Sequence, residues 1–256
     1  MAFSVLGGLL VLFVLLPIVN LLLTTEPSRI LAMAREPVVR EALFLTLGTA
    51  FLATVISLLF GIPLGYVLAR EQFPGKAIVE GIVDMPVVIP HTIAGIALLF
   101  IFGRAGIVGA PLQSLGVVFT DSSWGIVVAM LFVSMPFVVN HARDGFLKVD
   151  RRMESVARSL GANYLGAFFR VTMPLTWRAL LSGAILTWAR AISEFGSVAV
   201  IAYYPKTINT LLFEWYNYFG YTYTKPLAAL LLLVALAIFV MLRGVASFNR
   251  AKHDQA

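Results

Sequence analysis

Long stretches without a charged residue constrain this chain more than any other feature of its sequence. The first of them, Ala2–Thr25, spans 24 residues before the first charge at Glu26. As a helix that rises about 1.5 Å per residue, it is longer than the roughly 30 Å hydrocarbon core of a bilayer. A cleaved signal peptide is the alternative, because Ala32-Met33-Ala34 offers a small-x-small site, but the run lacks a basic n-region and is too long for an h-region. We therefore predict a membrane-spanning helix here.

Five further apolar runs follow along the chain. They are Ala42–Ala69, Met85–Gly103, Ser122–Ala142, Ala179–Pro205, whose only charges are Arg190 and Glu194, and Pro226–Leu242. The composition agrees with this pattern, because 60% of the residues are hydrophobic and only 12% are charged, whereas globular chains are about a quarter charged. We predict an all-α integral membrane protein in which six transmembrane helices form a single domain over residues 1–256.

The positive charges between these runs fall into two alternating sets, which indicates the orientation of the chain. One set of loops, together with the carboxyl-terminal end, holds 12 Lys and Arg, and the other set holds 6. Because cytoplasmic loops carry an excess of Lys and Arg, we expect the first set and both termini to be cytoplasmic, with the chain in the plasma membrane. We expect no nucleic-acid partner for the net charge of +6, since no basic run is interleaved with aromatic residues.

The longest loop, residues 143–178, falls on the cytoplasmic side and contains a short amphipathic pattern. Asp150 is a good N-cap and Gly161 a good C′ residue for a helix over residues 151–160. The apolar residues that share one face of this helix are Met153, Val156, Ala157 and Leu160. Such a helix can lie on lipid headgroups or fill a groove in another protein, and its periodicity alone does not decide between the two.

Residues 154–162, with the sequence Glu-Ser-Val-Ala-Arg-Ser-Leu-Gly-Ala, precede a Val-x-x-Pro step that ends at Pro174. These residues resemble the EAA loop of type I ABC importer permeases, which forms a coupling helix that enters a cleft of the ATP-hydrolysing subunit. Aligned on Gly161, the family's Glu-Ala-Ala falls on residues 155–157, so the glutamate is displaced by one position to Glu154. The residues that the resemblance assigns to ATPase coupling are Met153, Glu154, Ser155, Val156, Ala157, Arg158, Leu160 and Gly161.

Two ionisable residues fall at membrane depth in the fifth run. A charge there costs about 2.5 to 3.5 kcal/mol on insertion scales, so it usually faces a bundle interior or an aqueous path. Arg190 and Glu194 are one helical turn apart and can neutralise each other as a structural pair. Arg190 can also present its guanidinium to a passing anion while Glu194 holds it in place. Both roles are compatible, and we expect Ser193 and Gly196 beside the pair to allow close approach by a second copy.

The third run contains two prolines, Pro86 and Pro90, four residues apart. Prolines remove backbone donors and leave carbonyls exposed, which a bilayer tolerates only against protein or water. We therefore expect this segment to face inward. His91 has no second histidine or carboxylate at metal-ligand spacing, so no metal site is predicted. The candidates for a translocation path are Pro90, His91, Thr92, Arg190, Ser193 and Glu194.

Two further stretches, Glu80–Ala97 and Trp188–Gly196, are similar to molybdate or tungstate permeases, especially the archaeal kind. This resemblance implies an oxyanion importer made of a permease homodimer, two cytoplasmic ABC ATPase subunits and an extracytoplasmic binding protein. It also implies that ATP and Mg bind to the ATPase and that this chain carries no cofactor. Sulfate permeases share a proline-rich third span and a Glu-Phe-Gly in the fifth, so a sulfate or thiosulfate permease is the alternative.

Two other classes of protein are less well supported by the sequence. The chain contains no Gly-x-x-x-x-Gly-Lys-Ser/Thr motif, so we expect no ATP hydrolysis by that mechanism and no catalytic site. An ion-coupled secondary transporter would use Glu194 or Asp84, but no inverted repeat is apparent. An intramembrane enzyme would need a nucleophile and a base, for which Ser193 with His91 is the only pair. Neither arrangement has a spacing that favours it.

Overall fold

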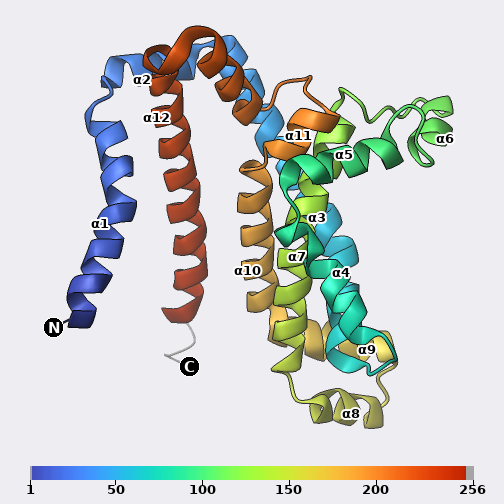
Figure 1. The fold of residues 1–256 in the computed structure, drawn as a ribbon. Helices are drawn as coiled ribbons and strands as arrows, with labels where there is room; N and C mark the ends of the chain where they lie inside the picture. Colours follow the sequence, from blue (N-terminus) through green and yellow to red (C-terminus); the bar gives the residue numbers. More distant parts are fainter. Residues whose placement is uncertain (1, 252–256) are drawn as a thin grey trace. The chain divides into compact units, whose positions relative to one another are not determined.

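The computed structural model of this protein describes the backbone of residues 2–251 and the side chains of residues 3–240. Throughout this part of the chain the regular structure is helical, which confirms the predicted all-α class. Figure 1 shows the helices in chain order. They form two compact units, one made of Met1–Phe44 with Lys206–Ala256 and the other of Leu45–Pro205. The single domain over residues 1–256 stays a prediction.

The first unit contains α1 (Ala2–Leu23), α2 (Pro27–Arg35), the start of α3 (Pro37–Arg70) and α12 (Ile208–Ala251). α1 and α12 lie side by side, and Lys225 Nζ donates a hydrogen bond to the carbonyl oxygen of Thr24 at 2.8 Å. Gly220 interrupts α12 with φ 74° and ψ −179°, a conformation that glycine alone adopts readily. The buried core of this unit consists of Val39, Ala42, Ile208, Leu211 and Leu227.

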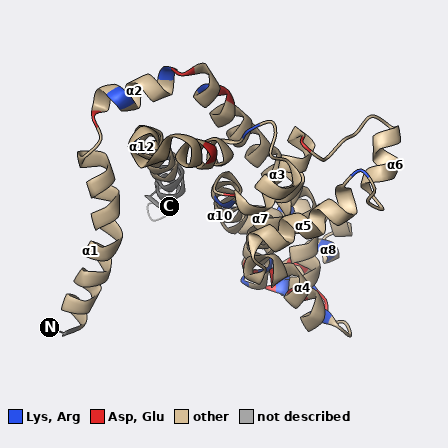
Figure 2. Ribbon diagram, turned by 45° about the horizontal axis from the view of Figure 1, so that its top comes forward, with Lys and Arg blue, Asp and Glu red and all other residues tan. Residues whose placement is uncertain are grey.

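α1 is apolar around its whole circumference. None of its 18-residue apolar window is buried within the chain, and Figure 2 shows charged residues only beyond its end, from the turn into α2 onwards. A helix that is hydrophobic on every side needs an apolar surrounding, which here the chain itself does not supply. The first predicted span is therefore a helix that is long and apolar enough to cross a membrane.

The second unit is built around α7. Its elements are the remainder of α3, α4 (Lys76–Val88), α5 (His91–Phe102), α6 (Gly109–Ser114), α7 (Ser123–Leu147), α8 (Arg151–Ser159), α9 (Tyr164–Ala167), a π-helix η1 (Phe168–Thr172), α10 (Met173–Ile192) and α11 (Gly196–Ile201). α7 packs along α10 and contributes buried residues such as Ile126 and Met130 to the core. α3 approaches α7 at Gly65, where an added Cβ would lie 2.7 Å from the Cβ of Ala142. The small-xxx-small spacing of Gly61 and Gly65 predicts such close packing.

The third apolar run is not one straight helix. α4 ends at Val88, α5 begins at His91, and the two helices are bent by 114° at the break between them. Ile89 precedes Pro90 and has an extended backbone with φ −67° and ψ 132°. The proline ring disfavours the helical conformation of the residue before it, so the helix stops there. The prediction of one continuous third span is thus wrong: the run is divided into two helices that form either a broken span or a re-entrant loop.

The fifth apolar run is also divided. α10 ends at Ile192 and α11 begins at Gly196, so residues 179–205 do not form the continuous span that was predicted. The carboxylate of Glu194 accepts hydrogen bonds from the backbone N–H and hydroxyl of Ser197 at 2.9 and 2.8 Å, which satisfies a donor in the first turn of α11. Among the described residues, α1, α3, α7 and α12 are long and apolar enough to span, with α4 and α5 as a possible fifth. The count of six stays a prediction.

Candidate functional site

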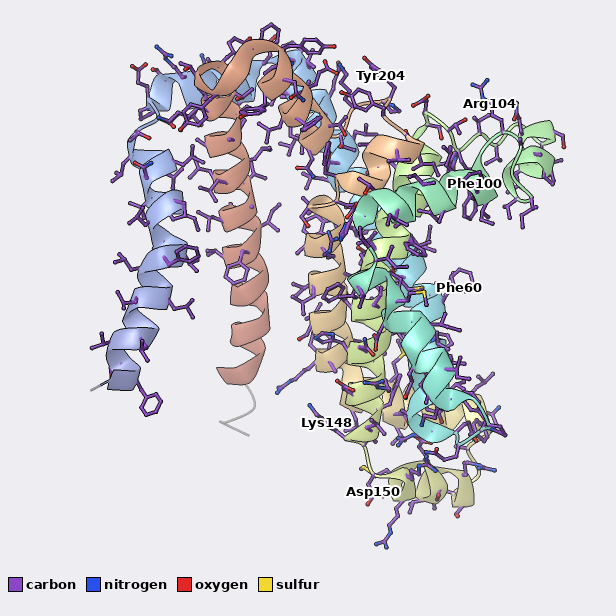
Figure 3. The ribbon with its side chains drawn as sticks, in the orientation of Figure 1. Phe60, Phe100, Arg104, Lys148, Asp150 and Tyr204 are labelled. Carbon is purple, nitrogen blue, oxygen red and sulfur yellow. The ribbon has the colours of Figure 1, made fainter. Side chains whose placement is uncertain are left out.

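The amphipathic helix of the long loop is present as α8, with the caps that the sequence predicts. The side chain of Asp150 accepts a hydrogen bond from the backbone N–H of Arg152 at 2.9 Å. At the other end Gly161 has φ 95°, and the N–H of Ala162 donates to the carbonyl of Ala157 at 3.1 Å. This is the geometry of a Schellman C-cap, in which glycine takes the left-handed conformation. Figure 3 shows Lys148 and Asp150 at the turn from α7 into α8, at one end of the second unit.

The predicted apolar face of α8 is turned away from the protein. Met153 and Val156 are exposed, and Leu160 has 84% of its surface accessible, whereas Ala157 is half-buried. A groove of about 800 Å³ adjoins this face, and Met153 and Lys148 lie in its lining. Adjacent exposed apolar side chains with a polar surround are typical of a protein interaction site. The face is therefore available to a partner.

Glu154 points in the opposite direction, toward its own chain. Its Oε1 accepts hydrogen bonds from Arg70 Nη2 at 2.7 Å and from Thr172 Oγ1 at 2.9 Å, and its Oε2 accepts one from Tyr66 Oη at 3.0 Å. Burial alone raises the pKa of Glu154, but these hydrogen bonds and the positive charge of Arg70 together lower it below its usual range. Glu154 thus stays ionised at neutral pH. Its assignment to ATPase coupling stays a prediction.

Sequence reasoning missed Arg70, Tyr66 and Thr172 as members of this site. Tyr66 and Arg70 come from the end of α3, 88 and 84 residues before Glu154, and Thr172 comes from η1. A buried arginine is rarely unpaired. The sequence singles out Arg70 only by its position immediately after a 28-residue uncharged run. That position does not indicate which residue Arg70 contacts.

The predicted ion pair between Arg190 and Glu194 is confirmed, with 3.0 Å between Nη2 and Oε2. His91 joins it, because its Nδ1 lies 2.6 Å from the same carboxylate oxygen, and Arg190 Nη2 lies 2.8 Å from its Nδ1 and 2.9 Å from its Nε2. Glu194 is fully buried, while Arg190 retains 23% of its side-chain surface. We call His91, Arg190 and Glu194 the charged cluster.

The local chain path explains how the charged cluster forms. Pro90 ends the break between α4 and α5, so that His91 is the first residue of α5. An added Cβ on Gly196 would lie 2.8 Å from the Cβ of His91. Gly196 therefore admits α5 of the same chain, and close approach by a second copy stays a prediction. Pro90 and Thr92 are exposed beside the cluster, and the inward orientation of this segment stays a prediction.

The cluster offers hydrogen-bond donors to an anion but no assembled nucleophile. Ser193 Oγ accepts from Arg190 Nη1 at 3.2 Å and donates to the Arg190 carbonyl at 2.9 Å. Within the described part of the chain, no hydrogen bond connects Ser193 to His91, which would be required for an intramembrane hydrolase. Asp84 lies apart from the cluster and accepts a hydrogen bond from Asn140 at 2.6 Å. The roles of all these residues in transport stay predictions.

The described part of the chain combines long apolar helices, a charged cluster drawn from α5, α10 and the residue Glu194, and an exposed amphipathic helix, features compatible with a membrane transport component. Residues 61–253 match the model of the family described as "Binding-protein-dependent transport system inner membrane component". The chain belongs to this family. It is a multi-pass membrane subunit of a transport system, and the predicted class of ABC importer permease is confirmed.

Individual relatives make the likeness more specific. The molybdate/tungstate transport system permease protein WtpB of Thermococcus kodakarensis is 44% identical, over 97% of this chain and 96% of its own. A probable sulfate transport system permease protein of Chlorokybus atmophyticus is 33% identical, over 85% of this chain and 77% of its own. A solved bacterial alginate ABC transporter aligns with a TM-score of 0.73 over 94% of this chain and 92% of its own, at 16% identity. At that identity the structural likeness concerns the fold alone.

Proposed function

We propose that this protein is the transmembrane permease subunit of an ATP-driven importer for a tetrahedral oxyanion, most readily molybdate or tungstate. The observation that carries this proposal is the 44% identity to a molybdate/tungstate permease along 97% of the chain. The 33% identity to a sulfate permease makes sulfate the second candidate substrate. The charged cluster supports an anionic cargo, because Arg190 is partly exposed and its guanidinium suits the oxygens of a tetrahedral anion.

The proposal includes partners that this chain needs in order to work. An extracytoplasmic binding protein would deliver the anion, as the family's description implies. Two copies of the chain would enclose the path, and two cytoplasmic ATPase subunits would bind ATP and Mg. The exposed apolar side chains of α8 would occupy a groove in each ATPase. Lipid would surround α1, and the charge bias of the loops supports cytoplasmic termini.

Alternating access would follow from the ATPase cycle. When the two ATPase subunits close on ATP, they would draw the two copies of α8 together, and the helical bundles would rock open toward the binding protein. The released anion would then pass the charged cluster, where the guanidinium of Arg190 can donate hydrogen bonds to it. Hydrolysis would reset the inward-facing arrangement.

Uptake by reconstituted vesicles tests the proposal. Vesicles containing the permease and its ATPase, with the binding protein outside and ATP inside, are offered molybdate, tungstate and sulfate in separate and competing assays. We expect ATP-dependent uptake of molybdate and tungstate that persists with a proton uncoupler. Uptake that collapses with the uncoupler and ignores ATP would instead establish a secondary transporter, and a preference for sulfate over both metal oxyanions would contradict the substrate.

A further inference from the structure

We propose that Glu154 is a positioning residue that fastens α8 to the body of the permease, so that a displacement of α8 moves α3 and α10 with it. The inference rests on the proposed function, in which α8 docks on an ATPase. Loops at residues 148–150 and 160–163 connect α8 to its neighbours in sequence. A helix held only by two loops would shift without moving the bundle, so a further attachment is needed for mechanical coupling.

Both carboxylate oxygens of Glu154 provide that attachment. Arg70 donates to Oε1 from both Nε and Nη2, at 3.0 and 2.7 Å, and Thr172 donates to the same oxygen. Tyr66 donates to Oε2. Charge-assisted hydrogen bonds of this kind are roughly twice as strong as neutral ones and fix geometry. One side chain of α8 is therefore bound to the end of α3 and to η1.

The first turn of α8 is attached to α3 a second time. Arg70 is only 7% exposed, and its Nη1 donates to the carbonyl of Val149 at 3.0 Å. In the other direction, Arg151 Nη2 donates to the carbonyl of Ala69 at 3.3 Å and to that of Arg70. The end of α3 and the start of α8 thus exchange hydrogen bonds in both directions. They move as one piece unless several of these bonds break.

An aromatic contact extends this attachment to α7 and η1. The ring of Tyr66 meets Phe146 of α7 edge to face at 5.3 Å between centroids and Phe168 of η1 at 5.0 Å. Phe146 is completely buried. Edge-to-face pairs are worth about 0.5–1.5 kcal/mol beyond their burial, and they orient the rings. Tyr66 therefore contributes its ring to the bundle and its hydroxyl to Glu154.

The hydrogen bond between Thr172 and Glu154 connects α8 with the start of α10. Thr172 is the last residue of η1 and is fully buried, and α10 begins at the next residue, Met173. α10 then runs 20 residues, or about 30 Å, to Ile192, beside the charged cluster. A push on α8 that reaches Thr172 through Glu154 is thereby applied to the start of the helix that carries Arg190. π-helical turns are frequent at functional positions of this kind.

The test measures the coupling ratio, defined as ATP hydrolysed per anion imported, for the complete transporter in vesicles. Glu154→Ala removes the attachment, and Glu71→Ala is the matched control, because it removes an exposed carboxylate one residue beyond Arg70. We expect both variants to retain the ATPase during purification. We expect Glu154→Ala to raise the coupling ratio about tenfold through lost uptake, and Glu71→Ala to stay within twofold of the wild type.

Two gentler variants keep the inference falsifiable if Glu154→Ala does not fold. Tyr66→Phe and Thr172→Val each remove one hydrogen bond and leave the Arg70 pair intact, so each should raise the coupling ratio about two- to fivefold. A coupling ratio unchanged in all folded variants would overturn the inference. So would specific loss of the ATPase from Glu154→Ala, since Glu154 would then belong to the docking surface. A wild-type permease that retains no ATPase would instead refute the proposed function itself.

Discussion

Two glutamates, Glu154 before α10 and Glu194 after it, have carboxylates that are held by hydrogen bonds from different sets of partners. Each is held by one arginine, and each uses both carboxylate oxygens. Glu194 is fully buried; its partners Arg190 and Ser197 lie within four residues of it in sequence, and His91 contacts it from α5, 103 residues away. Glu154 is 15% exposed, and its partner Arg70 is 84 residues away. Glu194 organises the local break between α10 and α11 and contacts α5 there, whereas Glu154 attaches α8 to α3 and η1.

This difference explains what each site is suited to do. Glu194 is fully buried, so its carboxylate orients Arg190 with little competition from water. The surroundings of Glu154 combine elements that would otherwise be connected only by loops. Glu194 fixes the direction of the Arg190 side chain. The hydrogen bonds of Glu154 fix the position of α8 relative to α3 and η1. The four predictions below separate these two roles, in order of decreasing effect.

The largest effect should come from breaking the buried pair. Arg190→Ala removes the guanidinium that neutralises the fully buried Glu194, and we expect a loss of about 3–5 kcal/mol in detergent melting. Glu194→Ala should be milder, because Arg190 can still reach solvent. The double variant Arg190→Met, Glu194→Leu should recover stability but not ATP-driven uptake. Full uptake by the double variant would show that the pair has a structural role only.

The second effect concerns the outer face of α8, where neither glutamate's carboxylate is involved. Ala157→Glu adds a charge to the face that we assign to the ATPase, and we expect about 2–3 kcal/mol of lost docking, or roughly a hundredfold weaker retention. Gly161→Pro should act similarly, because proline cannot adopt the φ of 95° found there. Membrane insertion should be nearly unchanged in both. If both variants retained the ATPase as the wild type does and transported normally, α8 would have no role in coupling.

A third effect is the pH dependence of the Glu154 network. The pKa of Glu154 is lowered in the folded protein, so its stabilising contribution is fully present above the ordinary pKa of glutamate, about 4.3, and is lost as the pH falls through the lowered value. Glu154→Gln should therefore cost about 2 kcal/mol at neutral pH, with a melting difference that is flat from pH 8 to about 5.5. Below about pH 4.5 the difference should shrink. A melting difference between wild type and Glu154→Gln that grows as the pH falls would contradict a lowered pKa of Glu154.

The smallest effect compares one hydroxyl at each glutamate. Ser197→Ala removes a hydroxyl donor to Glu194, and Thr172→Val removes one to Glu154. Each should cost about 1 to 1.5 kcal/mol in melting, because both hydroxyls are buried and bonded to a charge. Only Thr172→Val should also change the ATP hydrolysed per anion. Equal coupling ratios in the two variants would contradict the inference that Glu154, and not Glu194, connects α8 to the bundle.

Much of the local structure follows from sequence. The caps of α8 at Asp150 and Gly161 and the pairing of Arg190 with Glu194 depend on residues close in the chain, so spacing alone predicts them. The Gly61 and Gly65 pair likewise predicts a close helix contact, although not that α7 is the partner.

The features that sequence did not predict have a common physical origin. Long apolar runs indicate that a segment prefers a membrane, and they do not indicate whether it is one helix. Pro90 contained a usable signal for the break after Val88, but the end of α10 depends on Glu194 bonding to Ser197 instead of continuing the helix. The network around Glu154 joins residues 18 to 88 positions apart, and a single sequence carries no record of that contact.

The bend between α4 and α5 also changes the electrostatics near Arg190. Because α5 begins at His91, the N–H groups of its first three residues have no acceptor within the helix, and its peptide dipoles together carry about half a positive charge at that end. His91 brings this end against the carboxylate of Glu194. The negative charge of Glu194 is thus shared between the dipole of α5 and the guanidinium of Arg190. In the proposed function, this sharing would leave more of the positive charge of Arg190 available to an oxyanion.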